Sequence, residues 1–314
     1  MANIYDEIKY FYTSDKTEIE YADLGGKGPT LLFIPGYSLA TDLVLPALSK
    51  LSDDFRVVTL TLRGFGGANP TKARGSQLHG DISLRQAARD VRELIEYLQL
   101  KDTIVMGYSM GTHVALSYIE QFGCDKIDKL IILDMTPKLI NDDGWNLGLY
   151  QGHYTQERAL HDINVMADDY NKGFNQYFFH QAAMIHNRDE ARDYIFTQEM
   201  KNDIEEYAKW YNIPGLTADI LMFVPPKNWA LYRTYWKEMC DQDFRPMLKK
   251  ITVPTGIFYA NPGSIYDVKT AEYLGTNIPN AKLYPINNAV HTSLITYSTN
   301  DTFEQLRKFI NDFK

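Results

Sequence analysis

The chain has 314 residues, of which 45% are hydrophobic, 23% charged and 13% aromatic. This composition excludes disordered, collagenous and coiled-coil proteins, and it supplies enough apolar side chains for one large core or two smaller ones. The 40 Asp and Glu residues outnumber the 32 Lys and Arg residues, which gives a net charge of −8. Because no basic stripe offsets this charge, we expect no nucleic acid partner.

The sequence shows no targeting or membrane signal. Charges recur every few residues near the N-terminus, and no stretch approaches the roughly 20 apolar residues that a membrane span requires. Two cysteines, Cys124 and Cys240, lie 116 positions apart (240 − 124). This spacing suits neither a disulfide framework nor a metal-ligand pair. We therefore expect a cytoplasmic protein with no membrane partner.

From Ile8 to about Asp134, short apolar runs alternate with stretches of helical periodicity, a pattern typical of strands joined by crossover helices in a parallel sheet. The strongest helix prediction is Leu84–Leu98, where apolar residues recur at helical spacing behind a Ser83–Gln86 capping-box pattern. The first two of the predicted strands form a hairpin. The predicted strands are Ile8–Tyr12, Glu18–Ala22, Thr30–Ile34, Val57–Leu62, Thr103–Met106 and Leu130–Leu133.

The strand–helix alternation returns after residue 254 and continues to the end of the chain. Its predicted elements are the strand Thr255–Tyr259, the helix Val268–Leu274, the strand Lys282–Pro285 and the helix Phe303–Phe313. Between the two blocks lies an insert with poor strand character that holds all four tryptophans of the chain. We predict an α/β core domain from residues 1–136 and 247–314, and a helical cap domain from residues 137–246. The cap aromatics suit either its own core or the roof of a pocket.

The clearest chemical signal is the pentapeptide Gly107-Tyr108-Ser109-Met110-Gly111, which has the form G-x-S-x-G. It follows the predicted strand Thr103–Met106 directly and precedes the helical stretch Thr112–Phe122. A strand that turns at once into a helix strains its corner residue and raises that side chain above the edge of the sheet. This context predicts that Ser109 is a nucleophile.

With this motif in this context, the chain resembles the α/β-hydrolase superfamily, and within it the capped esterase, lactonase and perhydrolase branch. Further support comes from Ile34-Pro35-Gly36-Tyr37 and Arg63-Gly64-Phe65-Gly66-Gly67, each after a predicted strand. The resemblance implies a mostly parallel sheet flanked by helices, with His291 as the general base. It also implies an oxyanion hole formed by the backbone N–H groups of Tyr37 and Met110.

The acid of the implied catalytic triad is less clear. The superfamily's commonest acid follows the strand that is predicted here at Thr255–Tyr259, but the segment Ala260-Asn261-Pro262-Gly263-Ser264 contains no carboxylate. A known variation places the acid after the strand that follows the nucleophile helix, where this chain has Asp134. Asp134 is therefore the leading candidate and Asp267 the second, although Asp267 also suits a helix cap.

The resemblance implies a serine hydrolase that acts on a small-molecule carboxylic ester or lactone without a cofactor or metal. The histidines of the predicted cap show no metal-ligand spacing. An apolar or aromatic substrate is expected, and the residues predicted to line its pocket are Tyr37, Tyr108, Trp145, Trp210 and Trp229. Two alternatives stay open: a cofactor-independent dioxygenase of the 3-hydroxy-4-quinolone type, which has the same fold, and a ligand-sensing protein that retains a triad.

Overall fold

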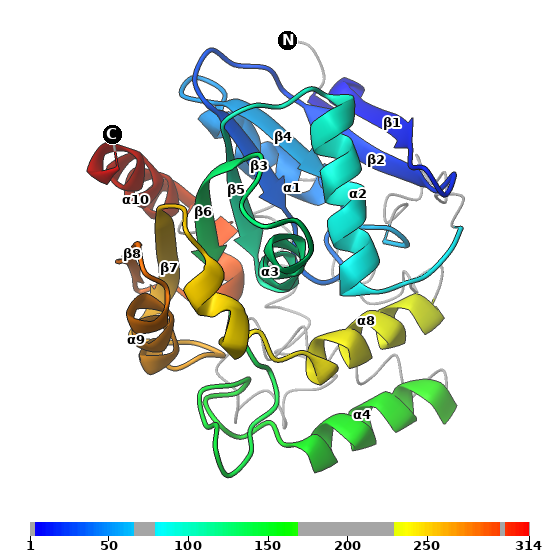
Figure 1. Cartoon of the computed structure of the whole chain (residues 1–314), viewed down its shortest axis with the longest axis vertical. Coiled ribbons are helices and arrows are strands. Elements are labelled where there is room, and N and C mark those ends of the chain that lie inside the picture. The colour runs from blue at the N-terminus through cyan, green and yellow to red at the C-terminus, as the bar shows by residue number, and fades with distance from the viewer. Residues whose placement is uncertain (1–3, 66–78, 169–228, 296–298, 314) are drawn as a thin grey trace, which may run out of the picture.

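A computed structural model describes residues 4–65, 79–168, 229–295 and 299–313. Its centre is an eight-stranded sheet with the strand order β1-β2-β4-β3-β5-β6-β7-β8 (Figure 1). The strands are β1 Ile8–Tyr12, β2 Glu18–Asp23, β3 Thr30–Ile34, β4 Arg56–Leu60, β5 Thr103–Tyr108, β6 Ile127–Leu133, β7 Thr255–Asn261 and β8 Ala281–Asn287. Every strand expected from the sequence is present.

β1 and β2 form the predicted antiparallel hairpin, and β2 joins the rest of the sheet by antiparallel pairing with β4. All remaining neighbours are parallel. The strand order reverses between β3 and β5, where Ile34 pairs with Gly107. In open α/β sheets, ligands bind beyond the carboxyl ends of the strands at such a reversal. The two segments that follow β3 and β5 are the predicted oxyanion strand end and the predicted nucleophile turn.

Successive residues of the buried strands face opposite sides of the sheet, so each strand contributes to two cores. The helices are α1 Thr41–Leu48, α2 Leu84–Tyr97, α3 Met110–Phe122, α4 Gln156–Asp168, α8 Trp229–Asp241, α9 Val268–Asn277 and α10 Thr299–Asp312. Leu32 and Ile34 belong to the core that includes α2, α3 and α9, whereas Leu31 and Phe33 belong to the core that includes α1 and α10. Short 3₁₀ segments are Ile4–Glu7, Ser49–Leu51, Arg245–Lys250 and His291–Ile295.

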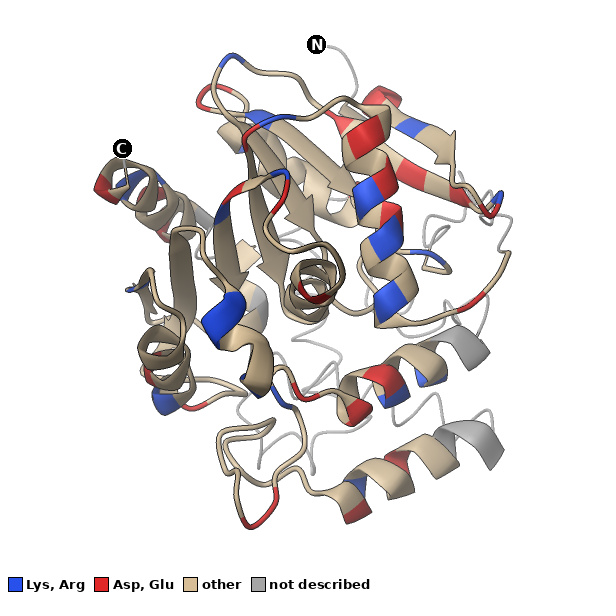
Figure 2. Ribbon diagram, viewed as in Figure 1, with Lys and Arg blue, Asp and Glu red and all other residues tan. Residues whose placement is uncertain are grey.

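The start of α2 differs in one detail from the predicted capping box. Ser83 Oγ accepts a hydrogen bond from the backbone N–H of Gln86 at 3.0 Å, as predicted. The Gln86 side chain does not return to Ser83 and instead donates to Asp90, one turn further along the helix. Figure 2 shows positive and negative residues interspersed along α2, where Arg92 pairs with Glu96 at 2.5 Å.

The insert between β6 and β7 contributes α4 and α8, which lie side by side beyond the carboxyl ends of the central strands (Figure 1). Tyr154, just before α4, accepts a hydrogen bond from Trp236 Nε1 of α8 at 2.9 Å and donates one to Asp162 of α4 at 2.9 Å. Residues 169–228 of the proposed cap lie outside the described part of the chain. Within that part, no helix combines the length and apolar character needed to cross a membrane.

Candidate active site

Ser109 is the corner residue between β5 and α3, and its backbone is strained. Its dihedral angles are φ +51° and ψ −125°, a region that side-chain-bearing residues rarely adopt. The glycines on either side permit this tight corner. A Cβ on Gly107 would lie 2.6 Å from the Cα of Thr112, and one on Gly111 would lie 2.0 Å from the carbonyl oxygen of Ile34. The pentapeptide therefore has the strand-to-helix geometry of a nucleophile elbow.

His291 lies in the loop between β8 and α10 and is fully buried. Its Nδ1 is 2.7 Å from Oδ2 of Asp134, a distance typical of a charge-assisted hydrogen bond. Its Nε2 is buried and has no hydrogen-bond partner among the described residues. An Nδ1–H directed at the carboxylate would leave the lone pair on Nε2, and this is the tautomer that a general base requires.

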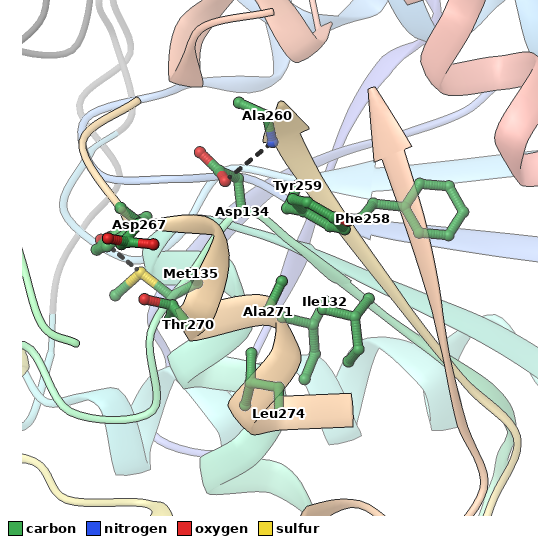
Figure 3. A pocket seen from close by; sticks show the side chains of 12 residues that line it. Ile132, Asp134, Met135, Phe258, Tyr259, Ala260, Asp267, Thr270, Ala271 and Leu274 are labelled. Atoms are coloured by element: carbon green, nitrogen blue, oxygen red, sulfur yellow. Dashed lines mark hydrogen bonds between the residues drawn. The ribbon is translucent and has the colours of Figure 1, made fainter. Parts of the chain in front are cut away.

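Asp134 is the residue directly after β6, with a positive φ of 49° and a buried side chain. Its Oδ1 accepts a hydrogen bond from the backbone N–H of Ala260 at 3.3 Å, and its Oδ2 accepts one from Ser264 Oγ at 3.3 Å. Figure 3 shows this carboxylate directed at the nitrogen of Ala260. The carboxylate thus contacts three donors, one of which is His291.

Asp267 has a different role in the structure. It precedes α9 and accepts a hydrogen bond from the backbone N–H of Lys269 at 2.9 Å, which is a helix N-cap. Both carboxylates line a small pocket between β6, β7 and α9, and neither Ser109 nor His291 lines it (Figure 3). The structure brings His291 to Asp134 and assigns Asp267 to the end of a helix.

Two tyrosine rings enclose the imidazole of His291. The ring of Tyr108 stacks on it with a centroid distance of 5.1 Å and an interplanar angle of 26°, and the ring of Tyr266 meets it at 5.8 Å and 76°. Tyr266 donates its phenol proton to Sδ of Met135 at 3.0 Å. Burial, and then the charge of Asp134, raise the pKa of Tyr266 well above its usual value. Tyr266 therefore remains neutral beside the acid.

The predicted oxyanion donors lie on two segments that meet at Ser109. Met110 is the first residue of α3, so its N–H has no partner within the helix. Gly36 lies against the elbow, because a Cβ added to it would be 3.1 Å from the Cβ of Ser109. Tyr37 is the next residue in the chain after this contact with Ser109. Backbone N–H groups from a helix start and a strand end can stabilise a developing oxyanion.

The side chain of Tyr37, predicted to line a substrate pocket, packs against the proposed cap in the structure. It is buried, and its phenol donates to the carbonyl oxygen of Tyr232 in α8 at 2.8 Å. Its ring also packs edge-on against Phe65 at 5.6 Å and Trp236 at 5.4 Å. These contacts fix the segment after β3 to a helix of the proposed cap.

Trp145, also predicted to be a pocket residue, packs within the segment that enters the proposed cap. Its indole N–H donates to the carbonyl oxygen of Lys138 at 2.9 Å, and its ring contacts Tyr273 of α9 and the guanidinium of Arg245. These contacts explain its burial as packing of the segment that enters the cap. Trp210 lies outside the described residues, as does the side chain of Trp229.

Reasoning from the sequence did not identify Ser264 or Tyr266 as site residues. Both follow β7, in and next to a segment that stood out only because it lacks a carboxylate. A hydroxyl at this position was an available signal, since a buried acid requires donors around it. Within the described ranges, no group of three His, Cys, Asp or Glu side chains is arranged to hold a metal ion.

This geometry agrees with the comparison of the whole sequence with known families. The profile of the family described as "alpha/beta hydrolase fold" matches residues 29–296. The chain belongs to the α/β-hydrolase fold family. The sequence prediction of this superfamily and its fold is thus confirmed.

Individual relatives of the family carry several activities in their names. A protein from Synechocystis sp. with the provisional name of non-heme chloroperoxidase is 25% identical over 281 residues, which cover 87% of this chain and 88% of that protein. A bifunctional esterase/perhydrolase from Acinetobacter calcoaceticus is 28% identical over 142 residues, which cover 43% of this chain and 49% of that protein. The names of these two relatives thus give different reactions.

Solved structures show the same fold at low identity. A bromoperoxidase from Bacillus anthracis has a TM-score of 0.71 and 21% identity, with 97% of this chain and 99% of that chain covered. An esterase from Exiguobacterium antarcticum has a TM-score of 0.72 and 20% identity, with 96% and 99% covered. An enol-lactonase from Burkholderia xenovorans LB400 has a TM-score of 0.67 and 16% identity, with 96% and 100% covered.

Proposed function

We propose that this protein is a serine hydrolase that cleaves a small-molecule carboxylic ester or lactone through an acyl-enzyme on Ser109. One observation carries the proposal: His291 bonds Asp134 through Nδ1, while its buried Nε2 has no partner in the described part of the chain. A base oriented in this way, in a fold with a strained serine at the sheet edge, suits acyl transfer. Relatives named as esterases and an enol-lactonase support this reaction class.

In the proposed mechanism, Nε2 of His291 takes the proton of Ser109 Oγ as this oxygen attacks the carbonyl carbon of the ester. The resulting oxyanion accepts hydrogen bonds from the backbone N–H groups of Tyr37 and Met110. The leaving alkoxide takes the proton from the imidazolium, and the acyl group remains on Ser109. Water then attacks the acyl-enzyme by the same sequence and releases the carboxylic acid. Asp134 orients the ring and stabilises the imidazolium throughout.

The test is turnover of p-nitrophenyl acetate and p-nitrophenyl butyrate by the wild-type protein and by Ser109→Ala. We expect the wild type to release p-nitrophenol with saturation kinetics. The variant should lose this activity while its circular dichroism spectrum and thermal midpoint stay those of a folded protein. Equal turnover by the two proteins would remove Ser109 from the mechanism.

Perhydrolysis, in which hydrogen peroxide accepts the acyl group, is a second candidate function because a relative of this chain is named an esterase/perhydrolase. Hydrogen peroxide would then replace water as the acceptor of the acyl group and give a peracid. The measurement is peracid formation from acetate esters with increasing peroxide, again with Ser109→Ala as the control. Peracid formation that saturates with peroxide and depends on Ser109 would favour this activity.

The paired His291 and Asp134 would also serve the dioxygenase alternative, in which the base deprotonates an aromatic hydroxyl. Oxygen uptake with 3-hydroxy-4-quinolones, together with inert p-nitrophenyl esters, would favour that reaction. A protein inactive in both assays would fit the ligand-sensing alternative. The elbow serine and the esterase relatives favour the hydrolase.

A further inference from the structure

Tyr108 is the last residue of β5 and the residue directly before Ser109. Its side chain, predicted to line a substrate pocket, is buried in the structure. The ring stacks on Phe33 with a centroid distance of 6.4 Å and on the imidazole of His291 at 5.1 Å. The ring of Tyr108 thus packs against side chains of the protein, one of which is the imidazole of His291.

The phenol of Tyr108 makes a second contact with the same histidine. It donates a hydrogen bond to the backbone carbonyl oxygen of His291 at 3.0 Å, across 183 positions of the chain. The ring contact restrains the plane of the imidazole, and the hydrogen bond restrains the backbone that carries it. Because Tyr108 is joined to Ser109 by one peptide bond, both restraints act relative to the nucleophile.

We propose that Tyr108 is a positioning residue that fixes the His291 imidazole relative to Ser109 through its phenol and stabilises the imidazolium through its ring. This inference rests on the proposed function, in which His291 exchanges a proton with Ser109. Misplacement of a base by a fraction of an ångström weakens proton transfer without weakening substrate binding. The phenol of Tyr108 should therefore affect kcat more than KM.

The role of the ring follows from the charge that His291 acquires during the reaction. An imidazolium over the face of a tyrosine within about 6 Å is attracted by the ring. Among the described residues, the imidazole has ring contacts with Tyr108 and Tyr266 and a hydrogen bond with Asp134, and Asp134 is the charged residue of these three. Removal of the Tyr108 ring should therefore disfavour the protonated form.

Two variants separate the two roles. Tyr108→Phe keeps the ring and loses the hydrogen bond, and we expect kcat to fall about 3- to 10-fold with KM little changed. Tyr108→Leu loses both contacts, and we expect the midpoint of the acidic limb of kcat/KM to move about 0.5 to 1 pH unit lower. The matched control is Tyr118→Phe, which removes a phenol bond to the carbonyl oxygen of Asp125, also at 3.0 Å. The control should lose stability without a change in kcat.

A second measurement follows the titration of the His291 imidazole by NMR of ¹⁵N-histidine-labelled protein. The His291→Ala variant serves to assign the signal. This readout needs no substrate, so it separates a failure of the inference from a failure of the proposed hydrolase activity. A lower midpoint for His291 in Tyr108→Leu and an unchanged one in Tyr108→Phe would support the inference. A wild-type midpoint in Tyr108→Leu, or kcat in Tyr108→Phe equal to that of Tyr118→Phe, would overturn it.

Discussion

Asp134 and Asp267 are the two carboxylates that compete for the role of acid in the proposed triad. Asp134 lies 2.7 Å from Nδ1 of His291, whereas Asp267 caps α9. We therefore expect Asp134→Asn to lower kcat on the order of 10³- to 10⁴-fold, because the amide would favour the wrong tautomer of the histidine. Asp267→Asn should change kcat by less than about 3-fold, because asparagine is also a good N-cap. The measurement is steady-state hydrolysis of a p-nitrophenyl ester. A larger loss of kcat in Asp267→Asn than in Asp134→Asn would show that Asp267 is the acid.

We expect Ser264 to be a positioning residue for Asp134, because its hydroxyl donates to the same carboxylate oxygen that accepts from His291. Loss of one such bond should lower kcat about 3- to 10-fold in Ser264→Ala. Ser264→Thr retains the hydroxyl and should restore most of the rate. A rate in Ser264→Ala equal to that of the wild type would show that the backbone N–H of Ala260 is a sufficient partner.

Besides His291, a buried histidine lies in α3, and the proposed mechanism does not use it. Nε2 of His113 lies 2.8 Å from the carbonyl oxygen of Thr136, its ring packs on Phe244, and burial lowers its pKa from 6.5 to about 4. The unfolded chain therefore binds a proton between pH 6.5 and 4 that the folded chain does not bind. This group's contribution to stability is present above pH 6.5 and is lost as the pH falls towards 4.

The expected effect is a loss of about 2 kcal/mol of unfolding free energy between pH 7 and pH 5 that depends on His113. His113→Gln keeps a donor for Thr136 and does not titrate, so its pH-dependent loss should be smaller than that of the wild type by this amount. Urea unfolding at the two pH values measures both losses. Parallel losses in the two proteins would show that His113 does not link protonation to folding.

The elements that the sequence predicted well are those whose local pattern agrees with the fold. β3 and β5 are continuous apolar runs because both of their faces are covered by helices, and their predicted starts are correct. α1 was not predicted, because it is only eight residues long and has Pro46 in its interior. Pro disfavours a helix interior, but here the packing of Val44 and Leu48 on the sheet outweighs this preference.

The candidate site likewise contains residues that the local sequence predicts and residues that it does not. Ser109 and its turn were predictable because the strain is encoded in five consecutive residues. The partner of His291 was ambiguous, since Asp134 lies 157 positions away from it and only the sheet order brings the two together. The packing contacts of Tyr108 and Tyr37 could not be predicted, because aromatic side chains near a site suit both substrate contact and packing, and their place in a substrate pocket stays a prediction.

Across the whole molecule, Arg63 joins the hairpin, α2 and the proposed cap. Its guanidinium is buried and pairs with Asp90 of α2 at 2.5 Å and with Asp15 of the β1–β2 turn at 3.0 Å. Its carbonyl oxygen accepts a hydrogen bond from Tyr235 of α8 at 3.1 Å. The guanidinium and the backbone carbonyl of this buried arginine thus connect segments that lie far apart in the sequence.

Removal of the Asp90 charge leaves the buried guanidinium of Arg63 with Asp15, which is more exposed, as its remaining carboxylate partner. Asp90→Asn should lower the unfolding free energy by about 3 kcal/mol, as measured by urea denaturation. The matched control is Asp243→Asn in the more exposed pair with Arg245, which should cost less than about 1 kcal/mol. Equal losses in the two variants would contradict a structural role for the buried pair.

In the proposed mechanism, Ser109 is a nucleophile that His291 activates. The most direct measurement is intact-mass spectrometry after exposure to a fluorophosphonate, followed by peptide mapping, for the wild type, Ser109→Ala and His291→Ala. We predict that the wild type gains one phosphonyl group on Ser109, that Ser109→Ala gains none, and that His291→Ala reacts far more slowly. An unlabelled wild type, or a label that persists in Ser109→Ala, would contradict the claim.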